Sequence, residues 1–175
     1  MNPLHDLSIG NPPEEVNVLI EIAKGSSNKY ELDKETGLLR LDRVLYSAVF
    51  YPMDYGLVPQ TYWHDGDSLD AFILSTYPFV PGSIVPSRPI ALLKMVDAGE
   101  RDEKLICVPV DDPRFAQYQD VGDIPDHTVT ELKNFFETYK ILQKKKVVVE
   151  GVDGKQAAID AIAEGQKLYK EKFGK

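Results

Sequence analysis

The spacing of apolar residues changes about two-thirds of the way along the chain, and this change limits the possible folds. Before residue 126, short apolar runs alternate with polar residues or end at glycine and proline, which is typical of strands and loops. After it, apolar residues recur every three or four positions, which predicts amphipathic helices. Several short strands followed by two helices favour an α+β fold with a mainly β core, in which helices pack outside a closed or barrel-like sheet. With 175 residues, the chain is expected to form one domain spanning residues 1–175.

The strands are predicted from runs that alternate or are uniformly apolar. They are residues 16–22, 29–32, 38–45, 71–74, 89–96 and 104–110. Residues 34–37, Lys-Glu-Thr-Gly, predict a hairpin turn between two of these strands. The proline and glycine residues of segment 52–59 predict a loop, and residues 147–149 predict a short strand between the two helices.

The first helix is predicted from an apolar face. That face consists of Leu132, Phe135, Phe136, Tyr139 and Leu142. Asp126 or Thr128 is expected to cap its start. The lysines at 144–146 are expected near its end, where the helix dipole favours positive charge. Residues 156–173 predict a final amphipathic helix.

Three aspartates, Asp65, Asp67 and Asp70, fall within one short segment and give the clearest chemical signal. Carboxylates this close repel one another, so their crowding favours a shared proton or a bound cation. Oxygen ligands suit hard ions, Mg²⁺ first and Mn²⁺ or Ca²⁺ after it. Gly66 allows a sharp turn between the first two aspartates. Taken alone, the segment fits a solvated acidic turn equally well.

A second acidic segment lies between two predicted strands. Asp97 and Asp102 bracket it, and Lys104 follows. If both acidic segments meet at one end of the sheet, their aspartates can hold more than one divalent ion, an arrangement that serves phosphoryl chemistry. Taken alone, the second segment fits a solvated loop.

Basic and tyrosine side chains complement these acids. Arg43 is expected to point inward because it shares a strand face with Leu39 and Leu41. A buried arginine needs an acidic partner, such as Glu31, or an anionic ligand. The other candidates are Lys29, Tyr51, Tyr55, Tyr139 and Lys140. Carboxylates for metals, with cationic groups and hydroxyls for phosphate oxygens, suit a small and highly charged phosphate compound.

The composition argues against several other classes of protein. A net charge of −8 is unfavourable for general nucleic-acid binding, which uses a basic face. No apolar run is long enough to span a bilayer and no export signal is visible, so a cytoplasmic protein without membrane partners is expected. Cys107 lies in an apolar run and is expected to be a buried strand residue. P-loop, EF-hand and nucleophile-elbow motifs are absent from the sequence.

The chain resembles the family I (soluble) inorganic pyrophosphatases of prokaryotic type, from about Val16 to the final helix. The matching segments, in order, are Ile20-Glu21-Ile22, Lys29-Tyr30-Glu31, Leu41-Asp42-Arg43, Phe50-Tyr51-Pro52 with Asp54-Tyr55-Gly56, Asp65-Gly66-Asp67-Ser68-Leu69-Asp70, Lys94-Met95-Val96-Asp97, Asp102-Glu103-Lys104 and Phe135-Phe136-Glu137-Thr138-Tyr139-Lys140. The ordered set is far more specific than the acidic segment alone. The chain departs from the family pattern at Ser68, where proline is usual, and at Ala98, where bacterial members often have an acidic residue.

The resemblance implies an OB-like five-stranded closed barrel with two flanking C-terminal helices. It also implies Mg²⁺-dependent hydrolysis of pyrophosphate to two phosphates, by direct attack of a water or hydroxide that bridges metal ions. Several Mg²⁺ ions per subunit are expected, and Mn²⁺ or other divalent ions can replace them. Prokaryotic members of similar length are usually cytoplasmic homohexamers.

Carried over residue by residue, the resemblance implies a role for each matching position. Asp67 would be the catalytic general base. The metal ions would be held by Asp65, Asp70, Asp97 and Asp102. Phosphate oxygens would be bound by Lys29, Arg43, Tyr55, Lys104, Tyr139 and Lys140. Supporting positions behind these groups would be taken by Glu21, Glu31 and Tyr51, with the glutamates orienting metal-bound water and the lysine.

Two other functions stay open at this point. One is hydrolysis of a different phosphoanhydride, polyphosphate or a nucleotide, which a substrate panel would distinguish. The other is a non-catalytic OB-type binding module, which would bind oligonucleotides in a salt-dependent way and release no phosphate.

Overall fold

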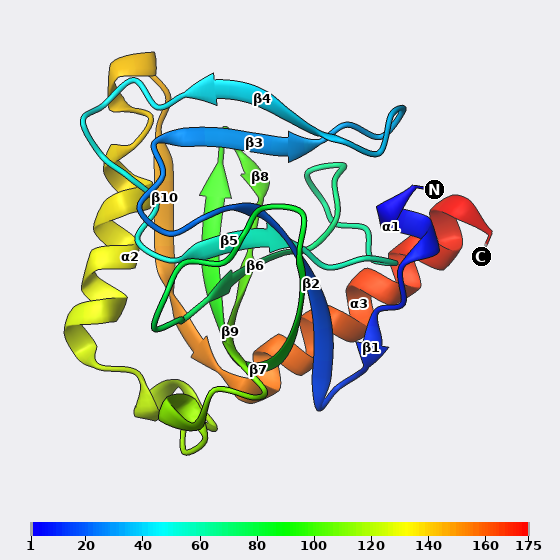
Figure 1. The fold of residues 1–175 in the computed structure, drawn as a ribbon. Helices are drawn as coiled ribbons and strands as arrows, with labels where there is room; N and C mark the ends of the chain where they lie inside the picture. Colours follow the sequence, from blue (N-terminus) through cyan, green and yellow to red (C-terminus); the bar gives the residue numbers. More distant parts are fainter. Residues whose placement is uncertain (1, 175) are drawn as a thin grey trace.

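A computed structural model describes residues 2–174, and Figure 1 shows the order of its elements. The strands are β1 (Gly10–Asn11), β2 (Glu15–Ile22), β3 (Asn28–Leu32), β4 (Leu39–Val44), β5 (Asp54–Leu57), β6 (Asp70–Ile73), β7 (Ile84–Asp97), β8 (Glu100–Arg101), β9 (Lys104–Pro109) and β10 (Val147–Gly154). The α-helices are α1 (Pro3–Asp6), α2 (Asp126–Thr138) and α3 (Lys155–Phe173), and short 3₁₀ helices are η1 (Pro113–Phe115), η2 (Val121–Asp123) and η3 (Ile141–Gln143). Within residues 2–174, no helix combines the length and the apolar sequence that a membrane crossing needs.

Five strands close into a ring of hydrogen-bonded neighbours, in the order β2, β5, β6, β9 and β7 and back to β2. The pairing of β6 with β9 is parallel and the others are antiparallel. The 14-residue β7 closes the ring, because its first residues pair with β2, its middle with β9 and its last part with β10. The prediction of a mainly β core in a mixed α+β fold, followed by two C-terminal helices, is confirmed.

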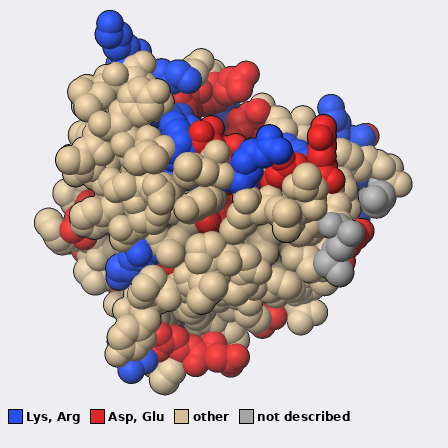
Figure 2. Space-filling view, turned by 45° about the horizontal axis from the view of Figure 1, so that its top comes forward, with Lys and Arg blue, Asp and Glu red and all other residues tan. Residues whose placement is uncertain are grey.

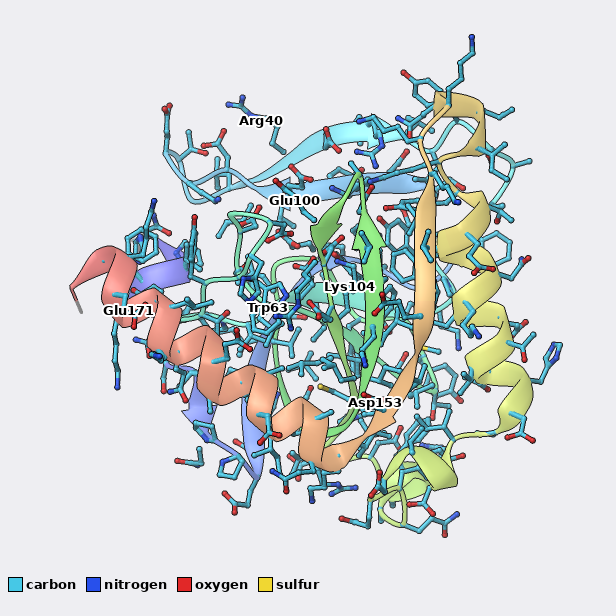
Figure 3. The ribbon with its side chains drawn as sticks, turned by 180° about the vertical axis from the view of Figure 1, so that it is seen from behind. Arg40, Trp63, Glu100, Lys104, Asp153 and Glu171 are labelled. Atoms are coloured by element: carbon cyan, nitrogen blue, oxygen red, sulfur yellow. The ribbon has the colours of Figure 1, made fainter. Side chains whose placement is uncertain are left out.

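Alternate residues of the ring strands face two separate hydrophobic cores. Phe72 and Ile106 belong to a core that α2 covers, whereas their neighbours Ala71 and Leu105 belong to a core that α3 covers. This division follows from strand geometry, since successive side chains point to opposite faces. In Figure 3, α3 crosses in front of the strands and α2 runs beside β10. Cys107 is buried in the second core, as predicted.

Strands β3 and β4 form a separate two-stranded hairpin, which lies across the top of the ring in Figure 1. Its turn is the one predicted at residues 34–37. Leu32, at the end of β3, packs with three other buried leucines, which are Leu4, Leu19 and Leu57. This small cluster fixes one end of the hairpin to α1, β2 and β5.

Three strand predictions are corrected by the structure. Residues 54–57 form β5 and not a loop. Gly56 is required because β5 passes close to β2, where a Cβ on residue 56 would lie 2.0 Å from the Leu19 carbonyl oxygen. β7 begins at Ile84, earlier than predicted, since its first residues reach β2. β10 extends to Gly154, because β7 continues opposite it.

The first predicted helix is also corrected. α2 ends at Thr138, so the lysines at 144–146 lie beyond it, and Leu142 is 63% exposed. The cap position at its start is Pro125, whose ring offers no acceptor, so Asp126 and Thr128 are not the cap. The early end of α2 has a consequence for the site, because the chain turns after Thr138 and presents Tyr139 and Lys140 at the end of the ring.

Candidate active site

A cavity of about 820 Å³ lies between the β3–β4 hairpin and one end of the strand ring. The structure places every predicted site residue in its wall. They are Glu21, Lys29, Glu31, Arg43, Tyr51, Tyr55, Asp65, Asp67, Asp70, Asp97, Asp102, Lys104, Tyr139 and Lys140. Figure 2 shows acidic and basic side chains side by side on this hollowed face of the molecule.

A buried lysine lies between two aspartates in the cavity wall. Because β6 runs parallel to β9, Asp70 at the start of β6 lies level with Lys104 at the start of β9. Lys104 Nζ lies 2.8 Å from Asp70 Oδ2 and 2.8 Å from Asp102 Oδ1. Burial favours the neutral amine, but the charges of Asp70 and Asp102 outweigh it and raise the pKa of Lys104 well above its usual range. The charged lysine therefore joins the two acidic segments.

The first acidic segment is a tight loop. It turns at Gly66, whose φ of +89° is unfavourable for residues with a side chain. Trp63 N donates to the Asp67 carbonyl at 2.7 Å, and Gly66 N donates to the Trp63 carbonyl at 3.1 Å. Asp67 N donates to Asp65 Oδ1 at 3.1 Å. Burial, followed by the charge of Asp102, raises the pKa of Asp65 to about 7.

Asp67 is an exposed aspartate of the cavity wall. Its side chain is 54% exposed, and Lys34 Nζ lies 3.0 Å from its Oδ1. Ser68 N donates to the same oxygen at 2.9 Å. Water therefore reaches this carboxylate from solvent, whereas Asp70 and Asp102 are tied to Lys104.

The end of α2 contributes a second contact between a lysine and an aspartate. Lys140 pairs with Asp97 through Oδ2. The other oxygen, Asp97 Oδ1, is buried and has no hydrogen-bond partner within residues 2–174. Burial lowers the pKa of Lys140, although the contact with Asp97 opposes this effect. An unpartnered buried carboxylate oxygen is costly unless a ligand meets it.

The hairpin adds cationic groups to the opposite wall. Lys29 pairs with Glu31 and lies 3.5 Å from Asp42 Oδ2, which also pairs with Arg43. Arg43 Nε is buried and lacks a hydrogen-bond partner among the described residues. The inward orientation predicted for Arg43 does not follow from the alternation with Leu41, because a β-bulge separates the two and Leu41 is 48% exposed. The orphaned N–H is a donor for an anionic ligand.

Three buried residues complete the inner wall. Glu21 Oε1 accepts a bond from Leu32 N at 2.7 Å, and burial, followed by the charge of Asp70, raises the pKa of Glu21 to about 8. Tyr55 donates its hydroxyl proton to Asp70. Burial raises the pKa of Tyr51 and Tyr55 well above the usual range, so both hydroxyls stay protonated.

The side chains of this cavity fit a hard divalent cation. Asp65, Asp70, Asp97 and Asp102 offer only oxygen ligands. Burial raises the pKa of Asp70, with the charge of Lys104 opposing and that of Asp102 adding to the effect, and burial with the charge of Asp102 raises the pKa of Asp65. A bound cation would favour the ionised form of both carboxylates. Within residues 2–174, no three acidic, histidine or cysteine side chains already converge as a coordination group. Lys104 and Lys140 lie against three of the aspartates, so ion binding requires these carboxylates to turn from ammonium to metal.

Several cavity residues received no role from the sequence, and two of them, Lys34 and Asp42, have charged side chains that pair with predicted site residues. Lys34 reaches Asp67 from the tip of the hairpin, and Asp42 links Lys29 to Arg43. Strand alternation would place Asp42 on the face opposite Arg43, and only the bulge brings both to Lys29. Lys34 lies in a turn, and its sequence carries no signal that the hairpin folds back over the ring.

Comparison with known proteins gives an independent finding. Residues 18–170 match the family model described as inorganic pyrophosphatase. The chain is 46% identical over 175 residues to an inorganic pyrophosphatase of Haloferax volcanii, covering 99% of each protein. It is 44% identical over 171 residues to soluble inorganic pyrophosphatase 1 of Arabidopsis thaliana, covering 97% of this chain and 81% of that protein. The crystal structure of an inorganic pyrophosphatase from Thermus thermophilus matches with a TM-score of 0.92 at 44% identity, covering 95% of this chain and 98% of the other.

Proposed function

Because the chain belongs to the inorganic pyrophosphatase family and hydrolyses inorganic pyrophosphate, we propose that the aspartate-lined cavity is its active site. One observation carries this proposal: a single cavity joins the acidic segments at the ends of β6, β7 and β9 to the cationic side chains of the hairpin and of the turn after α2. Pyrophosphate is a small polyanion, so its binding needs positive charge from both sides, and its hydrolysis needs a carboxylate that can accept a proton.

Divalent ions, Mg²⁺ foremost, would be held by Asp65, Asp70, Asp97 and Asp102. The unpartnered Asp97 Oδ1 and the raised pKa of Asp65 and Asp70 support this assignment. Bound divalent ions would supply positive charge for the phosphate oxygens and would lower the pKa of coordinated water. Asp70 and Asp102 would hold an ion in common, since both carboxylates lie 2.8 Å from Lys104 Nζ and are therefore near enough to each other to share an ion once they turn from that ammonium.

The basic side chains would bind and orient the substrate. Lys29 and Arg43 would contact phosphate oxygens from the hairpin, and Lys104 and Lys140 from the ring end. The unpartnered Arg43 Nε supports this role. Tyr139 would donate a hydrogen bond from its protonated hydroxyl, and Tyr55 would do so once Asp70 turns to an ion and no longer accepts its proton, because burial raises the pKa of each phenol. Glu21 and Tyr51 would hold these groups in place from the inner wall, and Glu31 would hold Lys29 from the hairpin.

Asp67 would act as the general base. A water oxygen attacks one phosphorus atom, the bridging P–O bond breaks, and the second phosphate leaves while Asp67 accepts a proton from the water. Its solvent-accessible carboxylate suits a group that must take up and release a proton in each cycle. The lysines and Arg43 would neutralise charge on the leaving phosphate.

A phosphate-release assay on pyrophosphate, with Mg²⁺ or with a chelator, tests the site. Asp67→Asn keeps an oxygen that can accept hydrogen bonds but is a far weaker base, so we expect turnover to fall by about a hundredfold or more while Mg²⁺ still binds. The matched control is Asp153→Asn on β10, an exposed aspartate paired with Lys94 at 3.3 Å, which should keep wild-type turnover. Wild-type turnover in Asp67→Asn would remove this residue from the mechanism. Equal rates on tripolyphosphate or ATP would instead favour a broader phosphohydrolase.

The finer architecture is part of the same proposal. The five-stranded ring would be an OB-like closed barrel, residues 1–175 would form one domain, and the protein would act in the cytoplasm as a homohexamer. The homohexamer is proposed from the resemblance to prokaryotic members of similar length.

A further inference from the structure

The only tryptophan of the chain joins the two acidic segments from behind the cavity. Trp63 is 1% exposed, and its Nε1 donates to Glu103 Oε2 at 2.9 Å. Arg101 Nε donates to the other oxygen, Glu103 Oε1, at 2.8 Å. The Arg101 guanidinium also lies over the Trp63 ring, 5.7 Å from its centroid. In Figure 3, Trp63 lies between α3 and the strand that carries Lys104.

Glu103 depends on both of these donors. It is 5% exposed, so its charge is removed from water and must be balanced within the protein. Each of its two oxygens receives one hydrogen bond, and Arg101 supplies the positive charge. If one partner of such a buried group is removed, the other is left without its hydrogen bond, which is energetically costly. This contact therefore resists being broken or shifted.

The hydrogen bond between Trp63 and Glu103 joins residues that are close in sequence to both acidic segments. Glu103 lies between Asp102 and Lys104, and Trp63 lies two residues before Asp65. The main chain of Trp63 is also bonded to Gly66 and Asp67. One side-chain hydrogen bond therefore connects the loop that carries Asp65 to the residues just before β9, which include Asp102.

Helix α3 supports the same unit from outside. His64 Nε2 lies 2.8 Å from Glu164 Oε1, and Tyr62 N donates to the Gly165 carbonyl at 3.0 Å. The loop before Asp65 is thus held both by β9 and by the helix, so a change in its position must break several contacts together.

We propose that Trp63, Glu103 and Arg101 are positioning residues that hold Asp65 and Asp102 at the separation needed to share a divalent ion. This inference rests on the proposed function of these aspartates as metal ligands. The three residues lie behind the cavity and act through Asp65 and Asp102, so they set the affinity for the ion and not the contacts with substrate.

The test is Mg²⁺ binding to the full-length protein without substrate, measured by isothermal titration calorimetry. Trp63→Phe keeps an aromatic ring but removes the N–H donor. Glu103→Gln removes the negative charge that pairs with the Arg101 guanidinium. Each is expected to weaken Mg²⁺ binding by about tenfold, the usual effect of losing a partner behind a metal ligand. The KM for pyrophosphate at saturating Mg²⁺ should stay unchanged. The double variant should weaken Mg²⁺ binding by less than the product of the two single effects, because both changes act on the same hydrogen-bonded group.

Two further variants separate positioning from stability. Arg88→Gln removes hydrogen bonds to the Phe115 and Tyr118 carbonyls, which lie outside the cavity wall. It should lower the Tm and leave Mg²⁺ affinity unchanged. Arg101→Gln acts on a side chain that is 53% exposed, so it is the variant least disturbing to folding. It should weaken Mg²⁺ binding with a loss of Tm no larger than that of Arg88→Gln, which leaves Mg²⁺ affinity unchanged.

The proposal is overturned if Arg101→Gln and every folded Trp63 or Glu103 variant bind Mg²⁺ within about twofold of the wild type. Asp70→Asn distinguishes this failure from failure of the proposed function. Loss of Mg²⁺ binding in Asp70→Asn with wild-type binding in Arg101→Gln and Trp63→Phe would reject only the positioning role. Wild-type binding in Asp70→Asn would reject the metal assignment itself.

Discussion

Gly56 shows how closely β2 and β5 approach at one residue. A Cβ at this position would lie 2.0 Å from the Leu19 carbonyl oxygen and 2.9 Å from the Ile20 Cα, and both atoms belong to the backbone of β2. Backbone atoms cannot turn aside as a flexible side chain does. Gly56→Ala is therefore expected to lower the free energy of unfolding by about 3 kcal/mol or more, as measured by urea denaturation.

Gly122→Ala is the matched control for this prediction. A Cβ on residue 122 meets no described atom within 4 Å, so the same change of one methyl group should be nearly neutral. If Gly56→Ala is as stable as Gly122→Ala, then β2 and β5 are not packed as closely as described.

Side-chain chemistry could be predicted from the sequence for most of the site, because crowded aspartates and strand-borne basic residues are visible without coordinates. Asp65, Asp70 and Lys104, for example, all line the one cavity, and their roles in it stay predictions. Asp42 could not be predicted, since its position depends on a bulge that breaks strand alternation. Lys34 could not be predicted either, because its contact depends on how the hairpin folds over the ring.

At the scale of elements, one carboxylate connects η2 to the start of α3. Gly154 at the cap position has no side chain, and Asp120 Oδ1 accepts bonds from Lys155 N at 2.9 Å and Val121 N at 2.7 Å. These backbone hydrogen bonds lower the pKa of Asp120 below its ordinary value of 3.8. Asp120→Ala should lower the Tm at pH 7, because α3 loses an acceptor for its first N–H groups.

The pH dependence of this loss of Tm follows from the direction in which folding shifts the pKa of Asp120. Since the pKa is lower in the folded state, the ionised carboxylate stabilises the fold at any pH above its unfolded pKa, and this stabilisation is lost as the pH falls through the folded pKa. The difference in Tm between wild type and Asp120→Ala should therefore shrink in acid. Asp120→Asn, which keeps an acceptor oxygen without the charge, should retain much of the cap and lose its pH dependence. A constant difference down to the acid limit would contradict the assignment.

Periodicity predicted most elements but could not fix their ends. The sequence of β5 resembles a loop because it contains Gly56. That glycine is required by the close approach of β2 and not by a turn in the local chain. α2 ends before its apolar pattern does, since Tyr139 turns into the cavity wall and Leu142 turns outward. In each case a contact with a distant part of the chain overrides the local pattern.

At the scale of the whole molecule, closure of the ring depends on β7 pairing with three different strands. Local sequence predicts a strand there, but it does not contain the partners. Closure brings the ends of β6, β7 and β9 to one side, where their acidic segments meet. The site is thus a product of topology, even though each of its groups is recognisable in the sequence.

Because an ion in this site would join segments far apart in the chain, it should stabilise the entire fold. Mg²⁺ at about a hundred times its dissociation constant should add about 2.7 kcal/mol to the free energy of unfolding relative to the protein in chelator. Thermal unfolding followed by circular dichroism measures this shift. Asp70→Asn should show little or none of it, and an equal shift in that variant would indicate that Mg²⁺ acts elsewhere.

The division of the ring strands between two cores has a practical consequence for protein engineering. Neighbours such as Ala71 and Phe72, or Leu105 and Ile106, belong to different interiors. Odd-numbered positions of β6 and β9 can therefore be redesigned together with the inward face of α3, for heat tolerance or easier production, while the even-numbered positions, which belong to the core that α2 covers, keep their native residues.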